Sequence, residues 1–121
     1  MMDFSDKNIL ITGGSGTLGQ GLLNRIKEFK RLSILSRSIK GQEDLRYMYP
    51  NVNFLSGDIQ DLDMVRHAVR GMDIVIHAAA FKYLDLGEEQ VRECVLTNIQ
   101  GSLNVLQAVK EDGRVKVCVG V

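Results

Sequence analysis

The chain has 121 residues, of which 45% are hydrophobic and 25% charged, and its 15 basic and 15 acidic side chains give a formal net charge of zero. Such a composition is that of an average globular protein, which excludes a disordered, collagen-like or low-complexity chain. No basic block marks a surface for nucleic acid, no apolar run approaches the ~18 residues of a membrane helix, and the N-terminus lacks a signal-peptide pattern. We therefore expect one cytoplasmic domain over residues 1–121 that binds neither nucleic acid nor membrane.

Short apolar runs alternate with longer amphipathic stretches along the whole chain. The runs are mostly β-branched or leucine, which is typical of parallel strands covered by helices on both faces. Right-handed crossovers between successive strands give the strand order 3-2-1-4-5. The sequence therefore predicts an α/β, Rossmann-like, doubly wound parallel sheet of five strands with helices on both faces. The predicted strands cover residues 8–12, 32–36, 52–55, 74–76 and 115–119.

Helices are predicted between these strands. Apolar side chains recur at helical spacing over residues 18–30, again at Val65 and Val69, and throughout a long stretch from about 88 to 110. The long helix carries two apolar rows, although one row suffices to cover a sheet. The second row is either packed under a neighbouring helix of the same chain or used for self-association. That row consists of Leu96, Ile99, Leu103 and Leu106.

A glycine-rich turn, with Gly13, Gly16 and Gly19 at three-residue spacing, joins the first strand to the first helix. Glycines there let bare backbone amides approach a pyrophosphate at a helix N-terminus, where unpaired N–H groups and the helix dipole favour negative charge. We therefore favour dinucleotide binding over a turn that only packs the helix against the strand. A nucleotide-hydrolase phosphate loop is excluded, because Gln20 follows the last glycine where that loop needs Lys. The candidate cofactor-binding residues are Thr12, Gly13, Ser15, Gly16, Thr17, Leu18 and Gly19.

The end of the second strand indicates which dinucleotide is bound. NAD-binding proteins usually place Asp or Glu there to hydrogen-bond the ribose hydroxyls, whereas this chain has Ser36, Arg37 and Ser38, with Lys40 just beyond. An arginine and small hydroxyls suit a 2′-phosphate, so these four residues are further cofactor-binding candidates. The alternative is that Arg37 and Lys40 are ordinary solvated charges. We expect NADP(H) to be bound in preference to NAD(H).

Two further segments, Gly-Asp-Ile-Gln-Asp at 57–61 and His-Ala-Ala-Ala-Phe-Lys at 77–82, combine with the glycine turn at 12–19. With all three, the chain resembles the extended short-chain dehydrogenase/reductase superfamily. Within it the resemblance is closest to the bacterial UDP-N-acetylglucosamine 4,6-dehydratases (inverting) and related epimerases and dehydratases of polysaccharide biosynthesis. The likeness covers residues 8–119, and the combination of segments is more specific than any one of them.

The resemblance implies roles for residues in the last two segments. It places the acid and the isoleucine of 57–61 at the adenine, and the three alanines of 77–82 beside the ribose and nicotinamide. The lysine of 77–82 lies near both cofactor and substrate in this family. The resemblance thus adds as cofactor-binding candidates Asp58, Ile59, Ala78, Ala79, Ala80 and Lys82, of which Lys82 is also the substrate-binding candidate.

Several of these residues also have a purely structural explanation. Asp58 also suits a helix N-cap or a turn, and Lys82 is equally well explained as a surface lysine. For His77 we favour a satisfied histidine at a strand end over a catalytic base. The resemblance gives Asn98 a supporting role in the long helix. Cys94 and Cys118 lie apart with no second pair, so we expect two buried, reduced thiols and no metal site.

The catalytic Tyr-x-x-x-Lys arrangement of the family is missing from these 121 residues. The last predicted strand also ends, at residues 119–121, without the hydroxyl side chain that the family carries there. A tyrosine that moves a proton needs a lysine nearby to lower its pKa, so we assign no catalytic residue. The residues four positions after Tyr47, Tyr49 and Tyr83 are Asn51, Asn53 and Gly87.

We therefore expect the NADP-binding N-terminal part of a nucleotide-sugar 4,6-dehydratase or epimerase, truncated, without a substrate domain and inactive alone. Its expected partners are the dinucleotide and, in a full-length relative, a UDP-sugar. The alternative function is a non-catalytic NADP-binding or interaction module that uses the helix at 88–110 to dimerise or to dock onto a partner. A remnant that folds but binds nothing is the third possibility.

Overall fold

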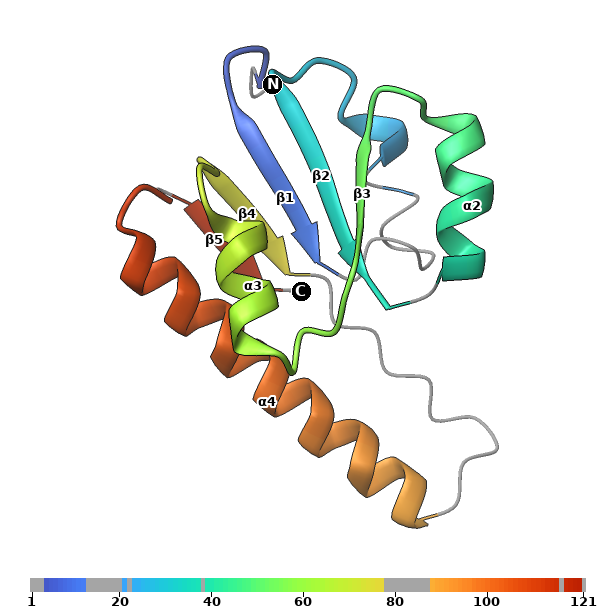
Figure 1. The fold of residues 1–121 in the computed structure, drawn as a ribbon, viewed down its shortest axis with the longest axis vertical. Coiled ribbons are helices and arrows are strands. Elements are labelled where there is room, and N and C mark those ends of the chain that lie inside the picture. The colour runs from blue at the N-terminus through green and yellow to red at the C-terminus, as the bar shows by residue number, and fades with distance from the viewer. Residues whose placement is uncertain are drawn as a thin grey trace.

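The computed structural model of the protein describes residues 4–12, 21, 23–37, 39–77, 88–115 and 117–120. It describes the side chains of all of these residues except 39–42, 88–98 and 117–120. A parallel β-sheet forms the centre of the protein. Its strands lie in the order β3-β2-β1-β4-β5 (Figure 1). This arrangement confirms the α/β class, the parallel Rossmann-like sheet and the predicted neighbours of the first strand. The strands are β1 (Asn8–Thr12), β2 (Arg31–Ser36), β3 (Asn53–Ser56), β4 (Ile74–His77) and β5 (Val117–Gly120).

Side chains on the two faces of the sheet enter two separate hydrophobic clusters. In β1, Ile9 and Ile11 belong to one cluster and Leu10 to the other, as the alternation of side chains along a strand requires. The first cluster includes residues from the helical positions 21 and 23–25 and from α2 (Ile39–Met48), and the second includes residues from α3 (Leu62–Val69) and α4 (Glu88–Asp112). Both faces of the sheet are therefore covered by helices, which explains why its strands are apolar throughout.

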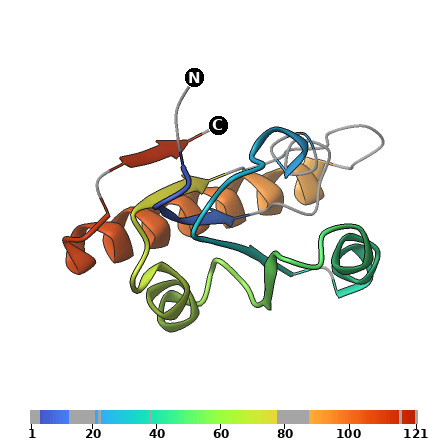
Figure 2. The same cartoon turned by 90° about the horizontal axis from the view of Figure 1, so that it is seen from above.

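Helices α3 and α4 lie side by side, whereas α2 lies at the far edge of the sheet next to β3 (Figures 1 and 2). Arg66 of α3 donates two hydrogen bonds to Glu111 of α4, at 2.8 and 3.0 Å. The arginine holds the pKa of the Glu111 carboxyl down to about 2, and its own pKa is raised by the same contact. Gly113 ends α4 at a φ of 70°, a backbone conformation that glycine adopts without strain.

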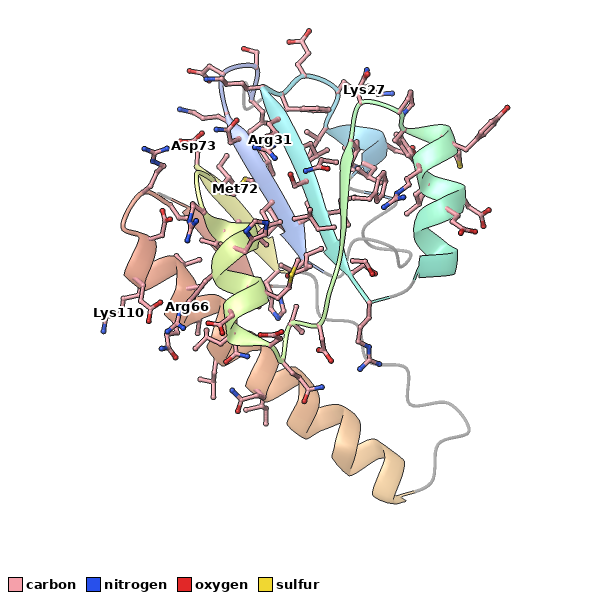
Figure 3. All side chains as sticks on the ribbon, viewed as in Figure 1. Lys27, Arg31, Arg66, Met72, Asp73 and Lys110 are labelled. Atoms are coloured by element: carbon pink, nitrogen blue, oxygen red, sulfur yellow. The ribbon has the colours of Figure 1, made fainter. Side chains whose placement is uncertain are left out.

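The side of the sheet at which the strands begin, here called its amino edge, is fixed by hydrogen bonds between β1 and the residue that precedes β4. The Asn8 amide donates to a carboxylate oxygen of Asp73 at 2.8 Å, and the Asp73 amide donates to the Asn8 carbonyl at 2.8 Å. Figure 3 shows Asp73, Met72 and Arg31 near this edge, far from the carboxyl ends of the strands. Among the described residues, no helix is long and apolar enough to cross a membrane.

One predicted helix was wrong in its extent, and one helix was not predicted. The helix predicted over 18–30 continues only to Arg25 in the described part, because the amides of Lys30 and Arg31 donate to the Lys7 carbonyl and draw the chain into the sheet. Ile26 and Phe29 nevertheless pack against the first cluster from irregular backbone. Helix α2 was not predicted at all, since its sequence is polar on average and carries only a weak apolar stripe.

Candidate functional site

The carboxyl ends of the strands lie together along one edge of the sheet. Strands β1, β2, β3 and β4 end there at Thr12, Ser36, Ser56 and His77. The chain runs outward from β1 through β2 to β3 and then returns to the other side of β1 as β4, so the direction of winding reverses between β1 and β4. In open α/β sheets, ligands bind outside the carboxyl ends of the strands at such a reversal. The candidate site is therefore this edge.

Two of the predicted site residues meet at this edge. Arg37 directly follows β2, and Asp58 lies two residues beyond β3, which pairs with β2 up to Ser36 and Ser56. The Arg37 guanidinium lies 3.8 Å from a carboxylate oxygen of Asp58, and its side chain remains 70% exposed. The Gly57 amide also donates to the Ser36 carbonyl, at 3.1 Å. The structure thus presents a reachable cation beside the loop assigned to the adenine.

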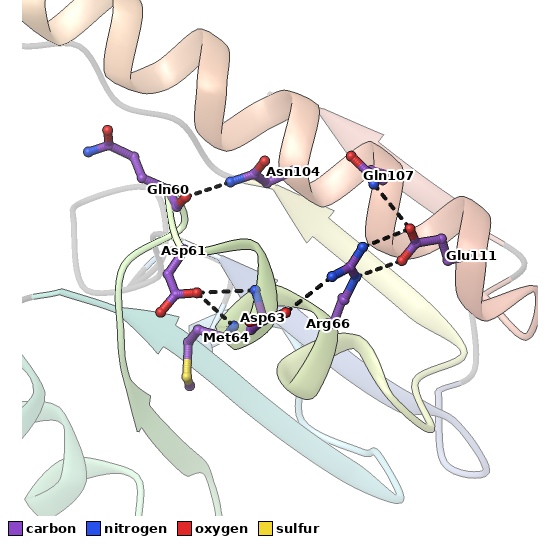
Figure 4. A network of polar contacts seen from close by, with 8 residues as sticks. All are labelled: Gln60, Asp61, Asp63, Met64, Arg66, Asn104, Gln107 and Glu111. Carbon is purple, nitrogen blue, oxygen red and sulfur yellow. Dashed lines mark hydrogen bonds and ion pairs between the residues drawn. The ribbon is translucent and has the colours of Figure 1, made fainter.

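The loop between β3 and α3 has its own turn chemistry. Asp58 accepts a hydrogen bond from the Gln60 amide at 2.9 Å through its side chain, and from the Asp61 amide at 3.0 Å through its carbonyl. Asp61, and not Asp58, is the N-cap of α3, because its carboxylate accepts from the amides of Asp63 and Met64 (Figure 4). The interpretation of Asp58 as a turn acid is confirmed, and its ion pair with Arg37 is additional.

His77 links β1 and β4, the two strands between which the winding reverses, to helix α4. Its Nδ1 lies 2.5 Å from the hydroxyl of Thr12, its partner in the β1–β4 register, and its Nε2 lies 2.9 Å from the hydroxyl of Ser102. Only 6% of the histidine is exposed, and this burial lowers its pKa. His77 is therefore the satisfied histidine that the sequence suggested, and it ties down Thr12 immediately before the glycine turn.

Helix α4 contributes two polar residues that the sequence analysis missed, Ser102 and Asn104. The Asn104 side chain donates to the carbonyls of Ile59 and Gln60, both at 2.9 Å (Figure 4 shows the second bond). A signal was present, since Gly101 followed by Ser102 in the middle of a helix is unfavourable unless packing requires it. What the sequence could not give was the partner, because Asn104 and Ile59 are 45 residues apart.

For the remaining candidates, the structure describes no side chain. For Lys40 and Asn98 only the backbone is described, in α2 and α4 respectively. No group of His, Cys, Asp or Glu that could hold a metal ion occurs within the described part of the chain. Outside the described residues lie Gly13, Ser15, Gly16, Thr17, Leu18, Gly19, Ser38, Ala78, Ala79, Ala80 and Lys82.

The described side chains at this edge include a group suited to a phosphate, the exposed guanidinium of Arg37. The guanidinium stands at the end of β2 beside the Asp58 carboxylate, and Asn104 holds the loop that carries Asp58. An arginine suits this role because its planar fork forms paired hydrogen bonds with phosphate oxygens. Chemically, the arrangement offers a phosphate group a charged, hydrogen-bonding partner.

Sequence comparisons agree with this geometry. A family model described as "Polysaccharide biosynthesis protein" matches residues 9–121. UDP-glucose 4-epimerase of Rickettsia bellii (strain RML369-C) is 40% identical over 96% of this chain and 36% of its own length. UDP-N-acetylglucosamine 4,6-dehydratase (inverting) of Campylobacter jejuni is 39% identical over 98% of this chain and 36% of its own length. The chain thus spans about a third of these relatives, and the resemblance inferred from its motifs is confirmed.

Solved structures share the fold over almost the whole chain. Pen from Bacillus thuringiensis has a TM-score of 0.89 at 38% identity, covering 98% of this chain and 38% of its own. WbmG from Bordetella bronchiseptica, solved in complex with NAD and UDP, has a TM-score of 0.74 at 26% identity, covering 96% of this chain and 37% of its own. Both are larger proteins that contain this fold as one part.

Burial of His77 predicts a pH dependence of stability. Its pKa is lowered from the ordinary 6.5, so between the two pKa values the unfolded chain binds more protons than the folded one. The free energy of unfolding should therefore be highest above about pH 6.5 and fall as the pH is lowered below it. His77→Gln should flatten this fall in urea unfolding experiments between about pH 5 and pH 8.

The matched control is His67→Gln, because His67 is exposed on α3 and should leave the fall in place. If wild type and His77→Gln lost stability equally on acidification, the buried neutral imidazole would be contradicted.

Proposed function

Since this chain belongs to the family of polysaccharide biosynthesis proteins, we propose that it is the dinucleotide-binding part of a nucleotide-sugar epimerase or dehydratase, with NADP(H) as its cofactor. The observation that carries the proposal is the placement of Arg37 beside Asp58 at the carboxyl edge, next to the point where the sheet reverses. An exposed guanidinium at the end of β2 is what a 2′-phosphate requires. WbmG, whose solved complexes contain NAD and UDP, shares the fold and supports a nicotinamide dinucleotide in general.

The described residues would act by holding the adenosine half. Arg37 would pair with the 2′-phosphate, Asp58 and Ile59 would border the adenine, and Thr12 would lead the chain into the turn at 13–19 that meets the pyrophosphate. Lys40 and Ser38 would extend the phosphate site. When bound, a nicotinamide dinucleotide accepts and returns a hydride, and the protein's contribution is to place it.

In this proposal, proton transfer comes from outside residues 1–121, and so does sugar recognition apart from a contact by Lys82. None of the three tyrosines is followed by lysine four positions on, so the Tyr-x-x-x-Lys pair that moves the proton is missing from residues 1–121. Lys82 is the residue proposed to lie near the substrate from this side. A UDP-sugar is the proposed substrate class of the complete enzyme, and residues 1–121 alone are proposed to be inactive.

Binding measurements test the proposal and its cause. Isothermal titration should show NADP+ binding more tightly than NAD+, because only NADP+ offers the 2′-phosphate to Arg37. Removing a charge-assisted hydrogen bond costs about 1.5–3 kcal/mol, so Arg37→Ala should weaken NADP+ binding roughly 10- to 150-fold and leave NAD+ binding nearly unchanged.

The control is Arg31→Ala, because Arg31 is an exposed arginine at the opposite end of the same strand, near the amino edge (Figure 3). It should keep the wild-type preference. Equal affinities for the two dinucleotides in the wild-type chain would contradict the choice of NADP, and no binding of either would contradict the function.

A second candidate function, self-association through α4, is favoured by an exposed apolar row on that helix. Ile99, Leu103 and Leu106 are 52%, 55% and 57% exposed, and their spacing places them on one face. The other apolar row of this helix consists of Val91, Val95, Val105 and Val109. Where its side chains are described it is already covered, since Val105 is buried and Val109 packs partly against the second cluster. We propose that a second copy of the chain covers the exposed row.

Light scattering at increasing concentration tests this second function. The wild-type chain should shift toward dimer, and Leu103→Glu should remain monomeric because a charge in an apolar contact is costly to bury. Lys110→Gln, which changes the charge of the same helix by one unit at an exposed position, should still dimerise. A wild-type chain that stays monomeric at high concentration would refute the candidate.

A further inference from the structure

One buried side chain of α4 holds the loop between β3 and α3 by hydrogen bonds. Asn104 is 4% exposed, and its amide nitrogen donates to two successive carbonyls of the loop, those of Ile59 and Gln60, at 2.9 Å each. The side-chain oxygen accepts a hydrogen bond from Gln100, also at 2.9 Å. A buried amide is costly unless its hydrogen bonds are made, and here both of its donors and its acceptor are used.

These bonds fix the course of the main chain and not merely the distance between two helices. The two carbonyls belong to consecutive peptide groups, so the single side chain sets the orientation of both. Separate contacts join α3 to α4, namely the ion pair of Arg66 with Glu111 and the second hydrophobic cluster. Because these other contacts already pack α3 on α4, the hydrogen bonds of Asn104 are not needed for that packing and act on the course of the loop.

Gly101 acts on the same loop from one turn earlier in α4. A Cβ atom at this position would lie 2.6 Å from Cγ1 of Ile59, which is closer than two non-bonded carbon atoms approach each other in proteins. The missing side chain lets Ile59 lie directly against the helix, while Asn104 holds the carbonyl of the same residue. Helix α4 thus determines both where the backbone of Ile59 runs and where its side chain lies.

We propose that Asn104 is a positioning residue for the dinucleotide, which holds the loop at 57–61 in the shape that receives the adenosine half. This inference rests on the proposed function, because it assigns that loop to the adenine. The consequence extends to Arg37, whose ion-pair partner Asp58 directly precedes Ile59 in the held loop. Asn104 itself touches no ligand in this proposal.

The test compares two ligands, NADPH and adenosine 2′,5′-bisphosphate, by titration of folded protein at low temperature. Asn104→Leu removes the donors at similar volume, and Asn104→Asp removes them while keeping the shape. Both variants should bind both ligands more weakly by the same factor, about 3- to 30-fold, since the shared adenosine part alone is affected. Gly101→Ala, which leaves Asn104 in place but displaces Ile59, should also weaken both.

Glu111→Gln is the matched control, because it loosens the pairing of the same two helices without touching the loop. It should lower stability and leave both affinities unchanged. The inference is overturned if folded Asn104 or Gly101 variants bind both ligands as tightly as wild type, or if Glu111→Gln weakens binding as much as they do. A wild-type chain that binds neither ligand overturns the proposed function as well, so the two failures are distinguishable.

Discussion

The hydrogen bonds that His77 makes with Thr12 and Ser102 hold together the ends of β1 and β4, on which the candidate site depends. Thr12 ends β1 and His77 ends β4, the two strands between which the winding of the sheet reverses. A ligand crevice at such a reversal is useful only if the strand ends on its two sides keep a fixed separation. A neutral imidazole between two hydroxyls achieves this at a buried position, where an ion would be costly.

Helix α4 acts as the second support of the carboxyl edge. Ser102 holds the His77 side chain at the end of β4, and Asn104 holds the backbone of the loop after β3, so one turn of the helix supports the structure on two sides of β1. The same helix is joined to α3 near its C-terminus, where Glu111 pairs with Arg66. Its inner face is thus committed to the site and the core, while Ile99, Leu103 and Leu106 leave its outer face apolar.

The sequence predicted most of the sheet, because strands buried on both faces have an unambiguous apolar pattern. It also predicted Arg37 and Asp58 as site residues, which the structure brings together as an ion pair. It did not predict α2, whose apolar stripe is weak, or the early end of the first helix at Arg25, which depends on hydrogen bonds to Lys7. Asn104 was missed for a related reason, since its partners are distant in sequence and a lone Asn beside apolar helix residues has no characteristic spacing.

The relatives contain this fold as about a third of their length, and the structure explains how such a part could serve them. In the proposed function, the Arg37 cation and the held loop at its carboxyl edge serve the cofactor and not the chemistry of the sugar. The most direct test is a proton–nitrogen NMR titration of the chain with NADP+. Amide signals of Thr12, Arg37 and Asp58 should move while those of Asn8 and Asp73 at the amino edge stay. Movement confined to the amino edge, or none at saturating NADP+, would contradict a dinucleotide site at the carboxyl edge.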